Sequence, residues 1–420
     1  MQAEIISIGN ELLNGRKVNT NASFMAALLA GIGIPVGRVT ACSDSMNEIG
    51  SVLEDALCRS DYVLVTGGLG PTSDDRTKKA VAKLLHKGLT FDAGAYDNLV
   101  SRMQRFGREM SHSMHDQATV IEGSTVIPNT KGTAAGMIIG CGPRFGNHTL
   151  VLMPGVPAEM KAMMELTVAP YLSKLVSTAI AHTQLRTVGV GESTLADLIG
   201  EIEGSLPEGS ELAYLPHTAG VDLMVSTRGA SRETVDRENR EIADAILQLA
   251  GRFVFTVGEK SFEETIGELL ISAGKTVAVA ESCTGGLIAS RLTDVPGSSE
   301  YFLQGFVVYS NRAKENTLGV PKEMIEQHGA VSEEVARAMA LGCLEKSGAD
   351  YAVSTTGIAG PSGGGSEKPV GMICLGLARR GSREVYSKTL YMYGDRAVNK
   401  FRFSQAALRE LWEHLKPPQE

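Results

Sequence analysis

The stretch DYVLVTGGLGPTSDDRT, residues 61–77, decides how the first part of the chain folds. Residues 61–68 predict a buried strand that runs into glycines, and residues 74–85 predict the helix that follows it. Elements of the same two kinds precede this stretch: strands at 3–8 and 34–40, and helices at 21–33 and 46–58. Strands that alternate with helices over short connections predict a parallel, doubly wound α/β sheet.

The carboxyl ends of the strands in such a sheet share one rim, where ligands bind. This places GNELLNG (9–15) and TGGLGPTSDD (66–75) together on that rim. Residues 181–257 read as β-α-β-β-α-β, which predicts a small ferredoxin-like module. Residues 258–420 return to an α/β pattern, with two strands expected to be antiparallel and a closing helix from about residue 395. We therefore expect three modules: 1–170, 171–257 and 258–420.

Composition limits the class of protein. The net charge is −8 over 420 residues, which argues against direct binding of nucleic acid. The six cysteines form no CxxC pair, so they fit a reducing cytoplasm better than a disulfide framework or a zinc site. No signal peptide is visible, and no stretch approaches the roughly 18 apolar residues that a membrane helix needs. We expect a cytoplasmic protein that does not bind membranes.

AESCTGG (280–286) puts two nucleophilic residues, Ser282 and Cys283, on a predicted strand-to-helix turn. A side chain on such a turn lies at the rim of the sheet, above backbone N–H groups that can stabilise an oxyanion. In the alternative interpretation, Ser282 or Thr284 only caps the next helix, which is the commonest use of these residues there. Cys283 is the weaker nucleophile candidate, because nothing basic adjoins it and free cysteines are commonly buried.

A serine nucleophile needs a base, and histidine does not supply one. His328 falls in a predicted turn and His414 in the last helix, whereas lysine is a known alternative base. VVYSNRAK (307–314) carries Lys314 and Tyr309 just past another strand end, where a desolvated lysine would have a lowered pKa. Tyr309 would relay the proton or position the hydroxyl. The alternative is that Lys314 merely starts a surface helix.

Two further segments suggest anion binding. GIAGPSGGGSEKP (357–369) follows a strand, and its free N–H groups would hold a phosphate or a carbonyl oxygen; a surface loop is the alternative. In GDRAVNKFRF (394–403), Arg396 falls in the first turn of a predicted helix. A cation there opposes the helix dipole, which suggests that Arg396 serves a ligand such as a phosphate.

Five segments in order, AESCTGG, YSNRAK, HGAVSEEVA, GIAGPSGG and GDR, closely resemble the nicotinamide-nucleotide amidase domain of the CinA family. The resemblance covers 262–420 and implies hydrolysis of nicotinamide mononucleotide to nicotinate mononucleotide and ammonia, without a cofactor. It implies that Ser282 is the nucleophile, assisted by Lys314 and Tyr309. The residues that it implies for substrate binding are Cys283, Thr284, Gly285, Gly286, Gly360 and Arg396. The N–H groups of Cys283, Thr284 and Gly285 are the candidates for the oxyanion hole.

TGGLGPTSDDRT also reads as a ligand site. Gly67, Gly68 and Gly70 bring backbone close to a ligand, and two carboxylates follow them at a helix start. Capping by Ser73 or Asp74 would explain one of these acids. Glycine N–H groups beside Asp74 and Asp75 suit a metal-bound diphosphate, because the carboxylates take a hard cation; Glu11 would join them on the same rim.

ISIGNELLNG, TGGLGPTSDDRT, KGTAAGM (131–137) and MPGVPAEM (153–160) resemble the molybdopterin-binding fold and, more closely, the amino-terminal domain of CinA proteins. This implies a pyrophosphatase that splits ADP-ribose into AMP and ribose 5-phosphate with Mg²⁺, Mn²⁺ or Co²⁺, and K⁺ as a candidate second cation. The residues implied are Glu11, Asp74, Asp75 and Thr77, with Gly67, Gly68, Gly70, Lys131 and Glu159. Arg76 departs from the apolar residue expected there.

A non-catalytic role for this first domain stays open. It would then bind a pterin-like or nucleotide ligand, or a protein partner such as a recombinase. We expect the whole chain to form a homodimer.

Overall fold

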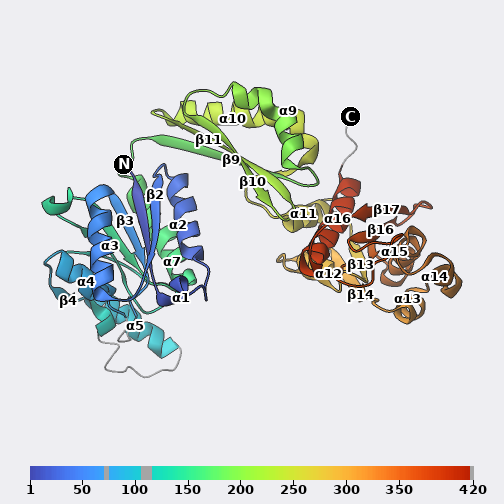
Figure 1. The fold of residues 1–420 in the computed structure, drawn as a ribbon, viewed down its shortest axis with the longest axis horizontal. Coiled ribbons are helices and arrows are strands. Elements are labelled where there is room, and N and C mark those ends of the chain that lie inside the picture. The colour runs from blue at the N-terminus through green and yellow to red at the C-terminus, as the bar shows by residue number, and fades with distance from the viewer. Residues whose placement is uncertain (71–74, 106–115, 417–420) are drawn as a thin grey trace. The chain divides into compact units, whose positions relative to one another are not determined.

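The structure is a computed structural model that describes residues 1–70, 75–105 and 116–416. Two compact units make up the chain. The first comprises Met1–Ala181 with Thr227–Glu238, and the second comprises His182–Ser226 with Asn239–Glu420. Figure 1 labels many of the helices and strands of both. No helix in the described ranges combines the length and the apolar composition that crossing a membrane requires.

A six-stranded sheet forms the centre of the N-terminal domain, in the order β2-β1-β3-β8-β7-β6. Its strands are β1 (Ala3–Ile8), β2 (Val36–Cys42), β3 (Tyr62–Thr66), β6 (Thr125–Ile127), β7 (Gly136–Gly140) and β8 (Thr149–Met153). β1 pairs in parallel with β2 and β3, and β3 pairs in parallel with β8. The predicted parallel sheet is confirmed, and β7 and β6 extend it in antiparallel fashion.

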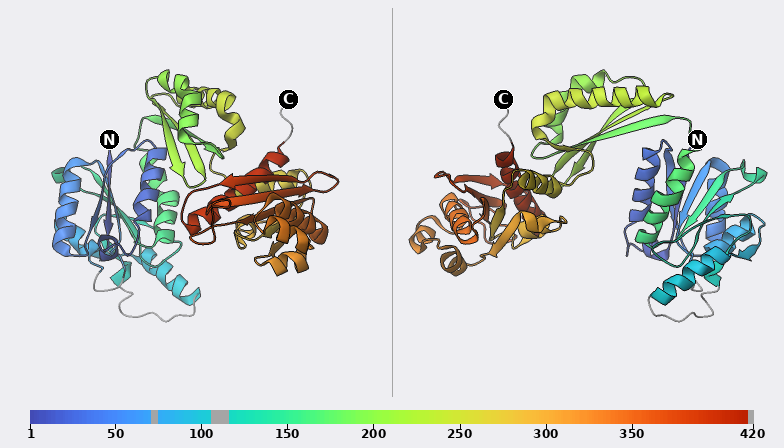
Figure 2. Two further views of the ribbon diagram at one scale, coloured as in Figure 1. Left: turned by 45° about the vertical axis from the view of Figure 1, so that its right-hand side comes forward. Right: turned by 180° about the vertical axis from the view of Figure 1, so that it is seen from behind.

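Helices cover both faces of this sheet (Figures 1 and 2). They are α1 (Asn10–Leu13), α2 (Thr20–Gly31), α3 (Met46–Arg59), α4 (Thr77–Leu84), α5 (Ala93–Arg105), α7 (Pro157–Met163) and α8 (Ala169–Ser173). Successive side chains of β1 point to opposite faces, so Ile5 joins the core under α2 and α7, while Ile6 joins the core under α3 and α4. β4 (Leu89–Phe91) and β5 (Thr119–Ile121) form a separate antiparallel pair.

The helix expected over 74–85 begins later, at Thr77. The Thr77 hydroxyl donates to the Gly67 carbonyl at 2.9 Å, and its N–H donates to the Gly68 carbonyl at 3.2 Å. These bonds tie the first helical residue back to the glycine turn, so the helix starts there. The expected cap at Ser73 or Asp74 falls outside the described residues. Residues 9–15, expected as a loop, contain the short helix α1.

The middle module has the predicted order β-α-β-β-α-β. Its elements are β9 (Ala179–Thr187), α9 (Glu192–Gly204), β10 (Ser210–His217), β11 (Gly220–Gly229), α10 (Arg232–Ala250) and β12 (Val254–Val257). The strands form one sheet in the order β10-β11-β9-β12. Helices α9 and α10 lie on one face of it (Figure 1). The small α+β module is thereby confirmed.

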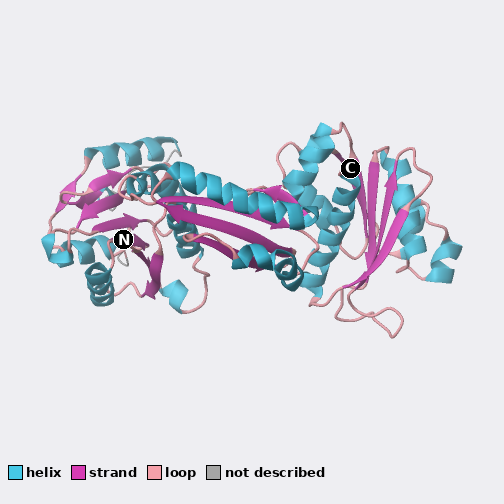
Figure 3. Cartoon of the chain, turned by 90° about the horizontal axis from the view of Figure 1, so that it is seen from above, coloured by secondary structure: helices cyan, strands magenta, loops and turns pink. Residues whose placement is uncertain are grey.

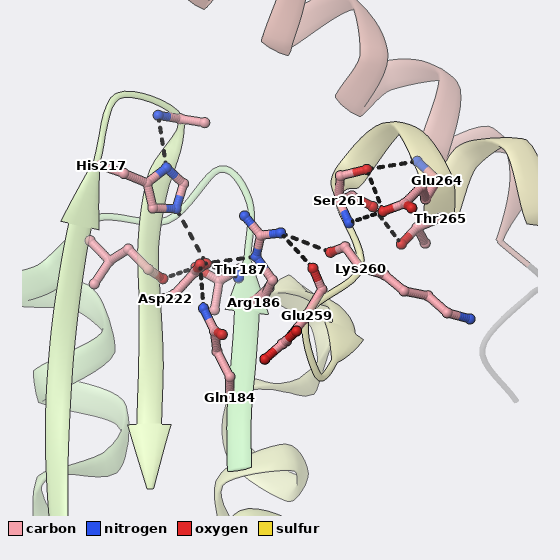
Figure 4. A network of polar contacts seen from close by, with 12 residues as sticks. Gln184, Arg186, Thr187, His217, Asp222, Glu259, Lys260, Ser261, Glu264 and Thr265 are labelled. Atoms are coloured by element: carbon pink, nitrogen blue, oxygen red, sulfur yellow. Dashed lines mark hydrogen bonds and ion pairs between the residues drawn. The ribbon is translucent and has the colours of Figure 1, made fainter. Parts of the chain in front are cut away.

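A buried carboxylate, Asp222, belongs to a network of polar contacts between this module and the start of the C-terminal domain (Figure 4). It accepts hydrogen bonds from the Thr187 N–H at 3.1 Å and from Arg186 Nε at 3.0 Å, and His217 Nε2 lies 3.2 Å away. Arg186 also donates to the Lys260 carbonyl at 2.8 Å. One residue later, Ser261 begins the capping box of α11 (Phe262–Ser272).

The C-terminal sheet has five strands in the order β14-β13-β15-β16-β17. They are β13 (Val277–Glu281), β14 (Phe302–Val307), β15 (Tyr351–Gly357), β16 (Met372–Arg379) and β17 (Tyr386–Tyr391). The first three run parallel, and β16 and β17 are antiparallel, as predicted. The carboxyl ends of β13, β14 and β15 therefore share one rim.

Helices flank both faces of the C-terminal sheet, as Figure 3 shows. Besides α11 they are α12 (Leu287–Thr293), α13 (Asn311–Leu318), α14 (Lys322–His328), α15 (Glu333–Ser347) and α16 (Arg396–Leu415). The predicted closing helix is α16, and one core packs it with α11 and α12 against the sheet. Short helical turns elsewhere span Asp116–Ala118, Pro143–Phe145, Met164–Val168, Gly251–Phe253 and Ser298–Glu300.

Candidate active site

Ser282 and Lys314 meet at the rim of the C-terminal sheet. Lys314 Nζ lies 3.0 Å from Ser282 Oγ, although 32 residues separate them in sequence. Each follows the end of one of two neighbouring parallel strands, β13 and β14, whose last residues, Glu281 and Val307, are paired. The pairing continues one step further, because the Val308 N–H donates to the Glu281 carbonyl at 2.8 Å.

Lys314 is buried, with 1% of its surface exposed. Burial lowers the pKa of its amine from the ordinary value, and no carboxylate among the described residues forms an ion pair with it to offset this. Nζ also contacts the carbonyls of Val308 at 3.1 Å and Tyr309 at 3.3 Å. In the structure Nζ donates to Ser282 Oγ as well as to these two carbonyls; a neutral amine would keep the two carbonyl bonds and offer its lone pair to the Ser282 hydroxyl.

The two alternative interpretations of these residues are wrong. The N-cap of helix α12 is Gly286, so neither Ser282 nor Thr284 is its N-cap. The Thr284 hydroxyl bonds instead to that of Thr355 at 2.8 Å. Lys314 does lie in helix α13, but its side chain is buried rather than on the surface.

A buried carboxylate that the sequence analysis missed, Glu281, holds the turn after Ser282. It accepts hydrogen bonds from the N–H groups of Gly286 at 2.9 Å, Ile288 at 3.1 Å and Ala289 at 2.8 Å. It thus occupies the N-terminus of α12, where an anion is stabilised. An acid directly before the nucleophile in AESCTGG is the signal that would have found it.

These bonds reduce the number of backbone N–H groups that could form the oxyanion hole. The N–H of Gly286 is taken by Glu281, and the N–H of Gly285 donates to the Ser282 carbonyl at 3.2 Å. Within the described part of the chain, the N–H groups of Cys283 and Thr284 have no other backbone or carboxylate acceptor. Of the backbone donors expected here, these two are available to a ligand.

Cys283 is 6% exposed and packs in the core beside the turn. Burial raises the pKa of its thiol to about 12, so the sulfur stays protonated near neutral pH. The thiolate is the nucleophilic form, so a sulfur that stays protonated is unreactive. This favours the interpretation of Cys283 as a buried, unreactive residue.

Tyr309 takes a different place from the one expected. Its hydroxyl accepts a hydrogen bond from Arg396 Nη2 at 3.1 Å, and 60% of the residue is exposed. The hydroxyl bonds to neither Ser282 nor Lys314; the carbonyl of Tyr309 contacts Lys314 instead. The sequence predicts that a residue just after a strand lies at the rim of the sheet. The direction of its side chain depends on neighbouring residues that the sequence does not reveal.

Arg396 is brought to the same site, in the first turn of α16 after the capping residue Asp395. Its Nη1 donates to the Gly360 carbonyl at 2.6 Å. Gly360 has φ +86°, and a side chain there would press on Val370, so the chain needs glycine at this point of the 357–369 loop. Within the described ranges two of the five donors of Arg396 are used, which leaves three for a ligand.

A cavity of about 250 Å³ connects these groups. Ser282, Lys314, Tyr309, Gly360 and Arg396 all line it. Other lining residues carry polar side chains that the sequence analysis did not select: Asn311, Thr356 and Ser362. Asn311 and Ser362 fall inside the motifs YSNRAK and GIAGPSGG, so only their position in those motifs could have suggested them.

Glu281→Gln is expected to weaken both folding and catalysis. Glutamine keeps one acceptor oxygen and turns an NH₂ group toward a backbone N–H, so a buried donor loses its partner. This should lower the free energy of unfolding by about 1–3 kcal/mol. Urea denaturation measures the loss, with the exposed Glu345→Gln on α15 as the matched control. Equal stability of the two variants would show that Glu281 does not hold the turn.

The glycine turn at the N-terminal rim is tight. Gly67 and Gly68 both have positive φ, +110° and +66°. A side chain at Gly67 would overlap the Ile8 carbonyl, and one at Gly68 would overlap the Thr77 hydroxyl. At Gly70, it would press on the Asp75 carboxylate. Glycines are therefore required to pack this turn against β1 and the start of α4.

Two of the three residues expected to bind metal, Glu11 and Asp75, lie in the described part of the chain. Glu11 lies in α1 after β1, next to Lys17 at 3.6 Å, and lines a cavity of about 330 Å³ with Asn21 and Thr66. Asp75 lies against the turn after β3, and Asp74 falls outside the described residues. Glu11 and Asp75 offer the hard oxygen atoms that Mg²⁺ or Mn²⁺ requires. Where the chain is described, however, no three acidic, histidine or cysteine side chains form a metal-binding group.

Glu159 and Lys131 lie near each other on this domain. The Glu159 carboxylate accepts a hydrogen bond from Asn129 Nδ2 at 2.7 Å and packs on Gly132, which has no room for a side chain. Lys131 is exposed, and its N–H donates to Asn129 at 3.1 Å. A role of either residue in binding substrate stays a prediction.

Three comparisons with known proteins all indicate the same family. Residues 4–174 match the model described as "Probable molybdopterin binding domain", 182–256 match "Damage-inducible protein CinA KH domain", and 259–415 match "CinA C-terminal domain". A CinA-like protein of Chlorobium limicola is 59% identical over 99% of this chain and 97% of its own length. One from Chlorobaculum tepidum is 57% identical, with 99% of each chain covered.

Among solved structures, the competence/damage inducible protein CihA from Agrobacterium tumefaciens is 40% identical. It covers 37% of this chain and 98% of its own, with a TM-score of 0.36. All three modules match in order, and full-length relatives share more than half of their residues with this sequence. The chain belongs to the CinA family.

Proposed function

We propose that the C-terminal domain hydrolyses the carboxamide of nicotinamide mononucleotide, giving nicotinate mononucleotide and ammonia. The observation that carries the proposal is the buried Lys314 amine, 3.0 Å from Ser282 Oγ and without a carboxylate partner among the described residues. A lysine in this state is a base suited to activate a serine. The resemblance of the five C-terminal segments to the amidase domain supports the choice of substrate.

In the first half of the reaction, Ser282 Oγ attacks the carbonyl carbon of the carboxamide. Its proton passes to the neutral Lys314 amine. The negative charge that forms on the carbonyl oxygen is stabilised by the N–H groups of Cys283 and Thr284. The ammonium of Lys314 then returns the proton to the departing nitrogen, ammonia leaves, and an ester remains on Ser282.

In the second half, water attacks the ester carbon and gives a proton to Lys314. The bond from carbon to Oγ breaks, nicotinate mononucleotide leaves, and Ser282 recovers a proton from Lys314. Arg396, with three unused donors, would hold the phosphate of the nucleotide, as guanidinium groups commonly do. Tyr309, fixed by Arg396 at the cavity, would contact the substrate rather than carry the proton.

Product analysis tests the proposal. The protein is incubated with nicotinamide mononucleotide, and chromatography with an ammonia assay follows the products. Equal amounts of nicotinate mononucleotide and ammonia are expected. Release of free nicotinamide, which would mean cleavage of the glycosidic bond, contradicts the amidase proposal, as does an unchanged substrate.

For the N-terminal domain we propose metal-dependent hydrolysis of ADP-ribose to AMP and ribose 5-phosphate. The supporting observation is the tight turn of Gly67 and Gly68, which brings bare backbone to the rim beside Asp75. Asp75 and Glu11 would hold a divalent cation, which when bound would neutralise the diphosphate and polarise its phosphorus–oxygen bonds. The turn would let the diphosphate approach the backbone closely.

Asp75→Ala is expected to abolish metal-dependent release of AMP from ADP-ribose, since a ligand of the cation is lost. Chromatography measures the AMP formed, and the exposed Asp97→Ala on α5 is the matched control. Full activity in excess chelator would refute the metal role. Calorimetric binding of ADP-ribose with no turnover would favour the alternative, a non-catalytic nucleotide-binding module.

A further inference from the structure

A second, larger cavity lies within the unit that contains the C-terminal domain. Its volume is about 570 Å³, and it shares no lining residue with the cavity at Ser282. From the middle module, residues 188–191 after β9 and 216–221 between β10 and β11 line it. From the C-terminal domain, β17, the residues after it and α16 line it: Lys388, Leu390, Tyr391, Met392, Tyr393, Arg402, Gln405, Ala406, Arg409 and Glu410.

Positive charge dominates the lining. Lys388, Arg402 and Arg409 face one carboxylate, Glu410, which pairs with Lys388 at 3.4 Å. Arg402 donates to the Tyr393 carbonyl, and in the described ranges it pairs with no carboxylate. Arg409 has only a long ion pair, with Glu413 at 3.9 Å, so the lining keeps an excess of positive charge that favours an anionic ligand.

Arg409 carries the clearest sign of a missing partner. Its Nε is buried and has no hydrogen-bond acceptor within the described chain; the nearest carboxylate oxygen, on Glu413, is 3.9 Å away. Buried polar atoms in folded proteins nearly always have a partner, so an unpaired one calls for a ligand or a water molecule. The guanidinium rests on Gly189, where φ is +72° and a side chain would overlap it. Glycine at this position thus makes room for Arg409.

Two further features of the lining suit a nucleotide. Helix α9 begins directly after this glycine segment, and its N-cap, Gly191, has no side chain that could bond to the first N–H groups. Its first N–H groups therefore add donors for a phosphate. Tyr391 and Tyr393 line the cavity and are 57% and 83% exposed. Exposed aromatic rings of this kind stack on planar bases.

We propose that this cavity binds a mononucleotide, with the phosphate at Arg402 and Arg409 and the base on Tyr391 and Tyr393. The site is separate from the amidase cavity. Both lie along α16, which begins with Arg396 at the first and carries Arg402 and Arg409 at the second.

Calorimetry with AMP tests the proposal, using full-length protein that carries Ser282→Ala and Asp75→Ala in excess chelator, because AMP is also a product proposed for the metal-dependent N-terminal site. The double substitution Arg402→Gln and Arg409→Gln is expected to weaken AMP binding at this site at least tenfold. Arg383→Gln, an exposed arginine between β16 and β17, is the matched control and should leave it unchanged. Arg396→Gln, which changes the amidase cavity, should also leave it unchanged. Unaltered AMP binding in the double variant would overturn the proposal, and so would loss of that binding in Arg396→Gln.

A second variant tests the proposal independently, in case the double variant does not fold. Tyr393→Ala removes an exposed ring, so the fold should be unaffected. It is expected to weaken AMP binding several-fold while inorganic phosphate binds as before. Wild-type affinity for AMP in Tyr393→Ala would contradict the base-stacking half of the proposal. If light scattering instead shows that the double variant turns a dimer into a monomer while AMP binding is unchanged, the cavity is an interface between copies and the nucleotide proposal fails.

Discussion

Lys314→Met should lower kcat for hydrolysis of nicotinamide mononucleotide by about 10²–10⁴-fold, the usual contribution of a general base. Methionine fills the same space but offers no lone pair to the Ser282 hydroxyl, so the nucleophile keeps its proton. Steady-state ammonia release measures the loss. Lys346→Met, an exposed lysine on α15, is the matched control. Wild-type turnover in Lys314→Met would rule the lysine out as the base.

The pH profile of the unmodified protein gives an independent readout of the same residue. Burial lowers the pKa of Lys314, and only its neutral form can accept a proton. Activity should therefore rise with pH through that lowered pKa and level off below the ordinary lysine value of about 10.4. Activity that falls as pH rises over this range would mean that the reaction needs the ammonium form at the start.

Ser282→Ala should lower kcat still further, by at least about 10⁴-fold, because the atom that forms the covalent bond is gone. Cys283→Ala is the matched control, since it removes the neighbouring sulfur but keeps the backbone N–H that the oxyanion would use. It should retain most of the activity, because burial keeps the thiol protonated, with a pKa of about 12. An inactive Cys283→Ala beside an active Ser282→Ala would reverse the assignment.

The approach of Lys314 to Ser282 was predictable from sequence in outline, because the topology brings both segments to one rim. Both residues follow ends of parallel strands, and such ends share a rim whatever the details of packing. The fold of the three modules was predictable on similar grounds, from the alternation of strands and helices.

Side-chain directions and backbone partners were harder to predict. The Tyr309 hydroxyl turns to Arg396, a residue 87 positions away, and no local pattern reports that contact. Glu281 looked like one more strand residue, although its carboxylate takes the N–H groups at the start of α12. Helix α4 starts at Thr77, which bonds to the Gly67 and Gly68 carbonyls, and no local sequence pattern reports those contacts.

The most direct test of the account is mass spectrometry of the Ser282 peptide after rapid acid quenching of a single turnover with nicotinamide mononucleotide. The account predicts an acyl group on Ser282 that appears with ammonia and decays as nicotinate mononucleotide forms, and neither product in Ser282→Ala. An acyl group on Cys283, or formation of nicotinate mononucleotide by Ser282→Ala, would contradict it.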